Sequence, residues 1–316
     1  MNILVFGKHG QLGKAFLKHF FSMHLAEMHI QYAGRDQCDL SNLHQLTDFL
    51  KQSKADLIIN AAAYTAVDKA ETEVDLAYAI NASAPECMAR YAVEQGATLL
   101  HYSTDYVFDG GKEGFYIEGD PRNPLGIYGK SKAAGEEAIE RAFVNASQGR
   151  YAIFRTSWVY GDGSNFIRTI LRLAKEREEL KVIEDQYGVP TNADWLANVS
   201  LHLVLDSQHK LREFASGIYH AVPNGETTWY GLAQLAIQAA QDAGVILKAG
   251  PGSIKPIPAV DYPLPAPRPS NSRMDATKLR MAIEQCGDMS KLKHCNRLWS
   301  DEVRVYVAQL AQAGLI

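Results

Sequence analysis

The sequence has few cysteines, and none of them is placed for zinc binding or for a redox pair. The four thiols are widely separated, with no C-x-x-C spacing and no histidines at zinc-finger spacing. We therefore expect reduced and mostly buried thiols at these four positions, which are Cys38, Cys87, Cys286 and Cys295.

Long apolar runs and an excess of basic charge are also missing. No apolar stretch reaches the ~18 residues that a membrane-spanning helix needs, and the chain does not open with a basic segment followed by a cleavable apolar one. The net charge of -4 leaves no basic footprint for nucleic acid or for an anionic membrane. We therefore expect a cytoplasmic protein that binds a small molecule, with no nucleic acid and no membrane as partner.

Short strand-like runs alternate with helix-like stretches through the first half of the chain. This alternation predicts an α/β protein with a Rossmann-type, doubly wound parallel sheet. Strands are expected near 2–6, 29–33, 56–60, 97–103 and 150–155, and helices near 11–22, 42–53, 73–95 and 129–146. The 316 residues leave room for a second, smaller lobe.

The pattern becomes less regular after Tyr160. The segment from Pro251 to Ser272 holds seven prolines, which predicts an extended, surface-packed loop. We expect residues 1–160 to form the sheet domain and residues 161–316 mainly a C-terminal substrate-binding lobe, with some later segments returning to the sheet. Helices of this half are expected near 165–178, 192–206, 228–243 and 297–313.

A glycine-spaced turn follows the first expected strand and opens a helix. In Gly7-Lys-His-Gly-Gln-Leu-Gly13 the small residues allow a tight turn and a close approach to a pyrophosphate, whose charge the helix N-terminus would meet. Its place after strand one makes the motif more specific than the glycines alone. We expect this domain to bind NADPH or NADH through Gly7, Gly10, Gln11, Leu12 and Gly13.

The second expected strand ends at Arg35-Asp36, about twenty residues beyond the turn. An acid at this place binds a ribose 2'-hydroxyl, whereas an arginine accepts a 2'-phosphate. The chain offers both, so the choice between NADH and NADPH stays open. Asp39 and Leu40 are expected beside the adenine; the alternative is that Asp39 or Ser41 only caps the next helix.

Three alanines follow the third expected strand, in Ile58-Ile-Asn-Ala-Ala-Ala-Tyr-Thr65. Such small side chains favour a wall that a flat ligand can approach, although alanine as an ordinary helix former explains the stretch equally well. We expect Asn81 to brace the site from the helix beneath. The cofactor's ribose and nicotinamide are expected to contact Ala62, Ala63, Tyr64 and Thr65.

Hydroxyl and amine side chains complete the candidate site. Tyr128 and Lys132 share a helix face at this spacing, so the ammonium would lower the pKa of the phenol from its ordinary ~10. Ser103 and Thr104 end the fourth expected strand, where a parallel sheet presents ligand-facing residues. The spacing of Tyr128 and Lys132 alone would suit any solvated helix, but the set as a whole predicts an oxidoreductase.

Further stretches extend these motifs over nearly the whole chain. They are Asn60-Ala-Ala-Ala-Tyr-Thr-Ala-Val-Asp-Lys-Ala-Glu71, His101-Tyr-Ser-Thr-Asp-Tyr-Val-Phe108, Phe154-Arg-Thr-Ser-Trp-Val-Tyr160, Asp185-Gln-Tyr-Gly-Val-Pro-Thr191 and Arg268-Pro-Ser-Asn-Ser-Arg273. With the glycine turn and Tyr128-Gly-Lys-Ser-Lys132, they make the chain resemble the dTDP-4-dehydrorhamnose reductase family, a branch of the extended short-chain dehydrogenases/reductases.

The resemblance implies NAD(P)H-dependent reduction of the 4-keto group of dTDP-4-dehydro-L-rhamnose to dTDP-L-rhamnose, a nucleotide sugar for polysaccharide biosynthesis. Tyr128 would protonate the forming alkoxide, and Thr104 would hydrogen-bond the same oxygen. Lys132 would lower the pKa of the phenol and hold the nicotinamide ribose. The implied contacts to the dTDP-sugar are Thr104, Asp105, Trp158, Asn165, Gln186 and Arg268, although Trp158 could also be a core aromatic.

Other functions on the same fold stay open. A 4-epimerase would use the same Tyr128 and Lys132, whereas a 4,6-dehydratase is disfavoured because Thr104 is followed by Asp105-Tyr106 with no second carboxylate. A non-catalytic regulatory subunit is a further alternative, since one relative pairs with a methionine adenosyltransferase.

Some relatives form dimers bridged by a magnesium ion that carboxylates hold near the start of the first helix. The helix expected at 11–22 has no acidic residue. We therefore expect no bound metal, and a homodimer or a monomer.

Overall fold

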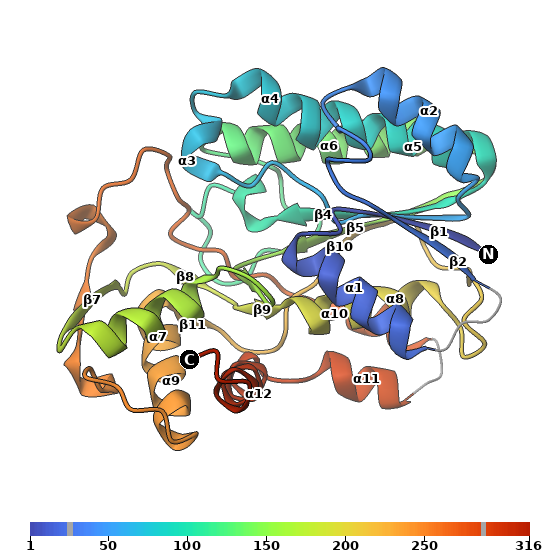
Figure 1. Ribbon diagram of the computed structural model, residues 1–316. Helices are drawn as coiled ribbons and strands as arrows, with labels where there is room; N and C mark the ends of the chain where they lie inside the picture. Colours follow the sequence, from blue (N-terminus) through green and yellow to red (C-terminus); the bar gives the residue numbers. More distant parts are fainter. Residues whose placement is uncertain (24–27, 286–288) are drawn as a thin grey trace.

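The computed structural model describes residues 1–23, 28–285 and 289–316, and its centre is a six-stranded parallel sheet (Figure 1). The strand order is β2-β1-β3-β4-β5-β10. The strands are β1 Asn2–Phe6, β2 His29–Ala33, β3 Leu57–Asn60, β4 Thr98–Thr104, β5 Arg150–Thr156 and β10 Gly217–His220. The chain changes direction of travel between β1 and β3, and ligands of such sheets bind at the carboxyl ends beside this switch point.

The doubly wound parallel sheet and its first five strands are confirmed. Every residue of β3 and β4 is buried, as expected for central strands that are covered on both faces. Strand β10 was not predicted. It has only four residues, and its pairing with Ala152–Arg155 of β5 identifies it as a strand.

Helices cover both faces of the sheet (Figure 1). One layer packs on Leu4, Ile58 and Leu99; the other packs on Ile3, Leu57 and Leu100, because side chains alternate along each strand. The first layer holds α2 Leu43–Ser53, α5 Ala84–Gln95 and α6 Ile127–Phe143, and the second holds α1 Gln11–Ser22, α8 Ala193–Val204 and α10 Thr277–Glu284.

The helix predicted near 73–95 is divided into three segments. Between α4 Val74–Tyr78 and α5 lies a π-helical turn, η1 Ala79–Ser83. Such turns are rare and occur frequently at functional sites. The short helices α3 Val67–Ala70 and α11 Met289–Cys295 were not predicted at all.

A smaller lobe has its own apolar core. It contains α7 Phe166–Glu176, α9 Trp229–Asp242 and α12 Trp299–Gln312, all three close to their predicted positions. Helix α8 comes from the same half of the sequence but packs on the sheet, with Trp195 and Leu196 in the core beside β1.

The prediction of an extended loop from Pro251 to Ser272 is wrong in part. Residues Ile254–Ile257 form β12, which pairs in parallel with β7 Leu180–Ile183, and 3-10 turns at Pro251–Ser253 and Ala259–Asp261 flank it. Pro256 is tolerated because this sheet has only two strands, each with a free edge.

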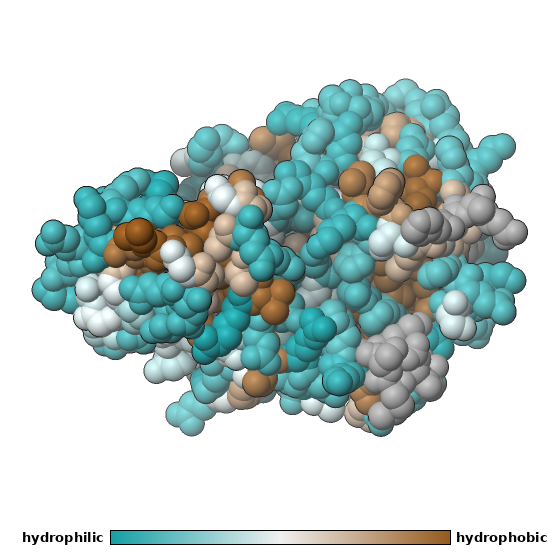
Figure 2. All heavy atoms as spheres, turned by 60° about the horizontal axis from the view of Figure 1, so that its bottom comes forward, coloured by the Kyte–Doolittle hydropathy of each residue, from teal (hydrophilic) through white to brown (hydrophobic). Residues whose placement is uncertain are grey.

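The thiols are mostly as predicted. Cys38 and Cys295 are buried and Cys87 is half-buried, and the thiols of Cys38 and Cys87 form no disulfide; Cys286 lies outside the described residues. No helix within the described ranges is long and apolar enough to cross a membrane. Figure 2 shows one face of the molecule as mainly hydrophilic, with apolar atoms in separate patches.

Candidate active site

The glycine turn lies at the carboxyl end of β1, beside the switch point of the sheet. Gly7 adopts φ +86°, and a Cβ on it would lie 2.7 Å from the carbonyl carbon of Ala61. A Cβ on Gly13 would lie 2.1 Å from the oxygen of Gly7. The first and third glycines are therefore required by close packing between β1, α1 and the loop after β3. Gly10 is the N-cap of α1, next to Gln11, Leu12 and Gly13 in its first turn.

An open cleft of about 400 Å³ lies over this switch point. It brings together the turn, the end of β2 and the alanine stretch after β3, as the sequence predicted. Its lining includes Gly7, Arg35, Asp39, Leu40, Ala62, Ala63, Tyr64 and Thr65. Cys38, Lys69 and Glu73 also line it and were not predicted.

Charged side chains at the cleft rim pair with one another. Arg35 Nε lies 3.6 Å from Asp39 Oδ2, and Lys8 Nζ lies 3.1 Å from Asp36 Oδ2. Desolvation raises the pKa of Asp36, but the hydrogen bond and charge of Lys8 help to outweigh it and hold this pKa below the usual range. Neither Asp39 nor Ser41 caps the next helix, as one alternative had it, because the side chain of Asn42 caps α2.

Asn81 fixes the loop that carries Tyr64. Its Oδ1 accepts from Tyr64 N at 2.8 Å, and its Nδ2 donates to Tyr64 O and to Ser131 Oγ, both at 3.0 Å. The π-helical turn places this buried amide between the loop and α6. The predicted bracing role is confirmed.

Thr104 and Asp105 follow one another at the carboxyl end of β4 and are both buried. Thr104 Oγ1 donates to Asp105 Oδ1 at 2.9 Å, and Ser272 Oγ donates to the other carboxylate oxygen. Burial raises the pKa of Asp105 to about 6, against the opposing effect of these two hydrogen bonds. This carboxyl therefore sits between its charged and neutral forms just below neutral pH.

Tyr128 lies in the first turn of α6, where its ring packs edge-on against that of Tyr106 with centroids 5.4 Å apart. Burial raises the pKa of the phenol to about 12; a hydrogen bond with Thr104 lowers it and the charge of Asp105 raises it. The expectation that Lys132 lowers this pKa is therefore not met. The phenol stays protonated at neutral pH, which is the state required of a proton donor.

Lys132 is turned toward β4 rather than toward the phenol. Its Nζ donates to the carbonyl oxygen of Tyr102 at 2.6 Å and lies 3.2 Å from His101 Nε2. Burial lowers the pKa of Lys132 to about 8, although the charge of Glu136 raises it. The ammonium form is therefore only weakly favoured at neutral pH.

Ser103 belongs to a separate buried cluster beneath the catalytic residues. Burial raises the pKa of Glu136, but the charge and hydrogen bonds of Arg155 and the charge of Arg122 hold it below the usual range. Ser103 Oγ has no hydrogen-bond partner among the described residues. Arg155 binds Glu136 through two nitrogens, at 2.9 and 2.7 Å. Side-chain alternation along β4 therefore separates Ser103 from Thr104, and only Thr104 contacts Tyr128.

An aromatic pocket of about 330 Å³ opens between the sheet and the smaller lobe. Trp158 forms one wall and stacks on Trp229, with centroids 3.7 Å apart. Trp158 has φ +48°, and a Cβ on Gly188 would lie 2.7 Å from its indole. A bulky residue in this backbone conformation indicates a functional constraint. Trp158 is therefore not an ordinary core aromatic.

The other predicted substrate contacts are divided. Gln186 and Arg268 line the aromatic pocket, and Arg268 also forms a two-pronged ion pair with Asp68 of α3, at 2.9–3.1 Å. Asn165 does not line it: its Oδ1 caps α7 at Arg168 N, and its Nδ2 donates to Tyr306 Oη at 2.8 Å. Both ends of the Asn165 amide are hydrogen-bonded within the lobe, so this residue is a poor candidate for substrate contact.

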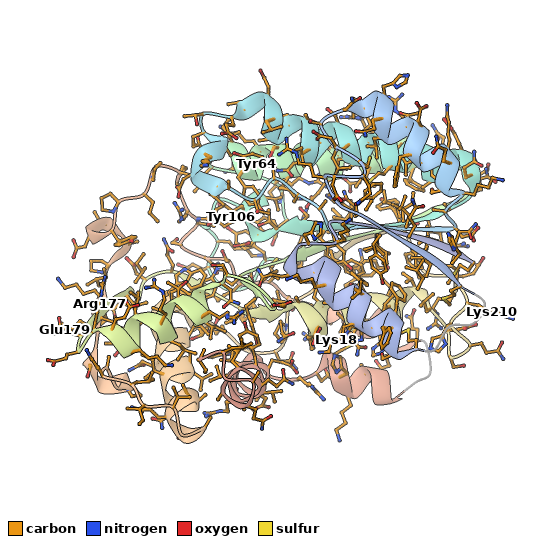
Figure 3. The ribbon with its side chains drawn as sticks, viewed as in Figure 1. Lys18, Tyr64, Tyr106, Arg177, Glu179 and Lys210 are labelled. Carbon is orange, nitrogen blue, oxygen red and sulfur yellow. The ribbon has the colours of Figure 1, made fainter. Side chains whose placement is uncertain are left out.

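Figure 3 shows Tyr64 and Tyr106 at the same end of the sheet, on the side that faces the smaller lobe. Tyr64 lines the switch-point cleft, whereas Tyr106 lines the aromatic pocket. Tyr128 packs on Tyr106, so the candidate proton donor lies beside the aromatic pocket.

A model of the family described as RmlD substrate binding domain matches residues 1–295. The chain belongs to this family. The dTDP-4-dehydrorhamnose reductase of Escherichia coli (strain K12) is 43% identical over 285 residues, which cover 89% of this chain and 91% of that protein. The family that the sequence motifs indicated is thus confirmed.

Two solved structures of dTDP-4-dehydrorhamnose reductases share the fold. The one from Clostridium acetobutylicum ATCC 824 has a TM-score of 0.83 at 32% identity and covers 98% of this chain and 99% of that one. The one from Bacillus anthracis str. Ames, in complex with NADP, has a TM-score of 0.79 at 30% identity and covers 97% and 98%. The parallel sheet with flanking helices is therefore the family's architecture.

The residues of this family member fit a dinucleotide at the switch point. Gly7 and Gly13 let the turn approach without a side chain in the way, and the first turn of α1 directs free backbone N–H groups toward the same place. In the described parts of the chain, no group of three or more His, Cys, Asp or Glu side chains is placed to hold a metal ion. The absence of a metal stays a prediction.

Sequence reasoning missed several residues of the site. Tyr106 and Ser272 stood inside the quoted motifs, so they could have been included; Trp229 had no such signal. It begins an ordinary apolar helix, α9, and only the tertiary structure brings it against Trp158 and Phe166. His101 also stood in a motif, and it contacts Lys132.

Proposed function

We propose that this protein is an NADPH-dependent oxidoreductase that reduces the 4-keto group of dTDP-4-dehydro-L-rhamnose to give dTDP-L-rhamnose. Membership of the family and the names of relatives that are about 40% identical support the reaction and substrate. The observation that carries the proposal is the position of Tyr128, next to Thr104 and packed on Tyr106 of the aromatic pocket.

When bound, the reduced dinucleotide supplies the hydride for the carbonyl carbon. Tyr128 then gives its phenolic proton to the oxygen that becomes an alkoxide, which is a much stronger base than a phenolate. A pKa raised to about 12 keeps the proton on the phenol until that moment. Thr104 orients the donor through its hydrogen bond, and Asp105 fixes Thr104 in turn.

NADPH is proposed over NADH because of the charges at the rim. Arg35 is 77% exposed and bound only to Asp39 at 3.6 Å, so it can turn to a 2'-phosphate without leaving a buried partner. Asp36, which would favour a 2'-hydroxyl, is already engaged by Lys8. The relative from Bacillus anthracis was solved with NADP, which agrees with this choice.

We assign the dTDP-sugar to the smaller lobe and the aromatic pocket. Trp158 and Trp229 offer flat apolar surfaces for a sugar or base, whereas Gln186 and Arg268 offer donors for a pyrophosphate or base. Asp105 is buried with both oxygens bonded, so it would reach the sugar only through an exchange of its partners. A dimer, and a place in the cytoplasm, stay predictions.

The decisive experiment is to follow nicotinamide absorbance with enzymatically generated dTDP-4-dehydro-L-rhamnose, with NADPH and NADH in parallel, and to identify the sugar product. We expect stoichiometric oxidation, dTDP-L-rhamnose as product and a higher kcat/KM with NADPH. An epimerase would change the sugar without net oxidation, and a regulatory subunit would do neither. Light scattering on the same sample separates a monomer from a homodimer.

A further inference from the structure

A row of buried polar side chains runs behind the catalytic residues, from β3 through β4 to α6. Asn60, His101 and Lys132 are each only 1% exposed. Asn60 Nδ2 lies 3.0 Å from His101 Nδ1, and His101 Nε2 lies 3.2 Å from Lys132 Nζ. The proposed reaction gives no part to His101 and leaves the proton state of Lys132 open, although buried polar groups are costly unless they are paired.

The amide of Asn60 determines which nitrogen of His101 carries the proton. Asn60 Oδ1 accepts from Ala62 N at 3.3 Å, so the NH₂ end of the amide faces the ring. An amide nitrogen only donates. Nδ1 of the neutral imidazole must therefore accept, and the ring proton lies on Nε2.

Only one proton can then lie between His101 Nε2 and Lys132 Nζ. An Nε2–H group and an ammonium N–H are both donors, and they cannot both point into a 3.2 Å contact. If Nε2–H donates, Nζ accepts as a neutral amine. An ammonium at Nζ requires the other tautomer, or a partner other than His101 such as the carbonyl oxygen of Tyr102.

We propose that His101, held by Asn60, is a positioning residue that sets the balance between the amine and ammonium forms of Lys132, which lies on the same helix as Tyr128. The proposal rests on the proposed reduction, whose pH dependence reports the proton state of Lys132.

The electrostatic surroundings of Lys132 agree with this role. The titratable groups that act on it are His101 on β4 and Glu136 on α6; Glu136 is itself paired with Arg155 and Arg122. Burial, and then the charge of Lys132, hold the pKa of His101 well below its ordinary value, so the imidazole stays neutral. Burial brings the pKa of Lys132 down to about 8.

The first test reads the tautomer directly, by ¹⁵N NMR of the protein with NADP⁺ bound, where the His101 signals are assigned from their loss in His101→Gln. We expect the Nε2–H form in the wild type. Asn60→Asp should switch the ring to Nδ1–H, since a carboxylate accepts from Nδ1. An Nδ1–H form in the wild type would overturn the proposal. This reading does not depend on turnover, so it can fail while the proposed reduction stands.

The second test is the pH dependence of kcat. His101→Gln offers a carbonyl oxygen to the ammonium, so the alkaline limb should move up by about one pH unit. Asn60→Asp should move it in the same direction through the tautomer. His101→Leu removes the Nε2–H donor that favours the amine and should also move it up, by less than His101→Gln because leucine offers no acceptor, while the exposed His29→Gln should leave it unchanged. If all three interior variants lose kcat equally and the alkaline limb of the pH profile does not move, His101 has a purely structural role.

Discussion

Charged side chains in the protein interior behind the candidate site differ from those at the rim of the dinucleotide cleft in exposure and in hydrogen bonding. In the interior, Lys132, Glu136 and Arg155 are at most 1% exposed and make short hydrogen bonds. At the rim, the side chains of Arg35 and Asp36 are 77% and 57% exposed. Water and salt weaken a rim pair, whereas an interior pair becomes costly as soon as one partner is lost. The interior therefore determines the chemistry and the rim determines which cofactor is preferred.

The largest effect is expected at the proton donor. Tyr128→Phe keeps the ring and its contact with Tyr106 but removes the phenolic proton beside Thr104. We expect kcat to fall by about 10²–10⁴-fold, with the Kd for NADPH unchanged. Stopped-flow reduction and fluorescence titration of NADPH measure the two quantities. Full turnover in this variant would assign the proton to another group.

The next effect concerns stability in the interior. Glu136→Gln leaves the guanidinium of Arg155 buried without its counter-charge, so the free energy of unfolding should fall by about 3–5 kcal/mol. Glu140→Gln is the matched control on the same helix: it also pairs with Arg122 but is 36% exposed, and it should cost at most about 1 kcal/mol. Urea denaturation compares them. Equal losses would contradict the distinction between interior and rim.

A pH effect is expected at Asp105. Its pKa rises from 3.8 to about 6 on folding because of burial, so its proton favours the folded state and this contribution is lost as the pH rises between those values. The free energy of unfolding of Asp105→Asn, taken relative to that of the wild type, should therefore be about 1–3 kcal/mol higher at pH 7.5 than at pH 4. Thermal unfolding across this range measures the difference. If the difference in stability between the two proteins does not change with pH, folding does not raise the pKa of Asp105.

The smallest effect is expected at the rim. Arg35→Ala removes a solvent-exposed cation, so the Kd for NADPH should rise by about tenfold while that for NADH changes less than twofold. Arg177→Ala, an exposed arginine at the end of α7, is the control and should change neither. Titrations at two salt concentrations should show a smaller loss at high salt. Equal losses for both cofactors would give Arg35 a structural role.

The sequence by itself determined the elements and the kind of chemistry. Apolar runs located the first five strands of the sheet, and most clearly β3 and β4, because buried parallel strands are nearly continuous in hydrophobicity. The glycine turn identified the dinucleotide cleft, since no other residue tolerates those close approaches. Tyr128 and Lys132 were found because their spacing fixes them on one helix face.

Only the tertiary structure decided where the polar side chains point. Spacing could not show that Lys132 turns to His101 and Tyr102 instead of the phenol, or that Asn165 is used up by a helix cap and Tyr306. Nor could it show the stack of Trp158 on Trp229. These choices depend on which donors, acceptors and rings meet across distant segments. Such contacts between distant segments cannot be predicted from local sequence, because they contribute free energy only when the sheet and the smaller lobe are assembled.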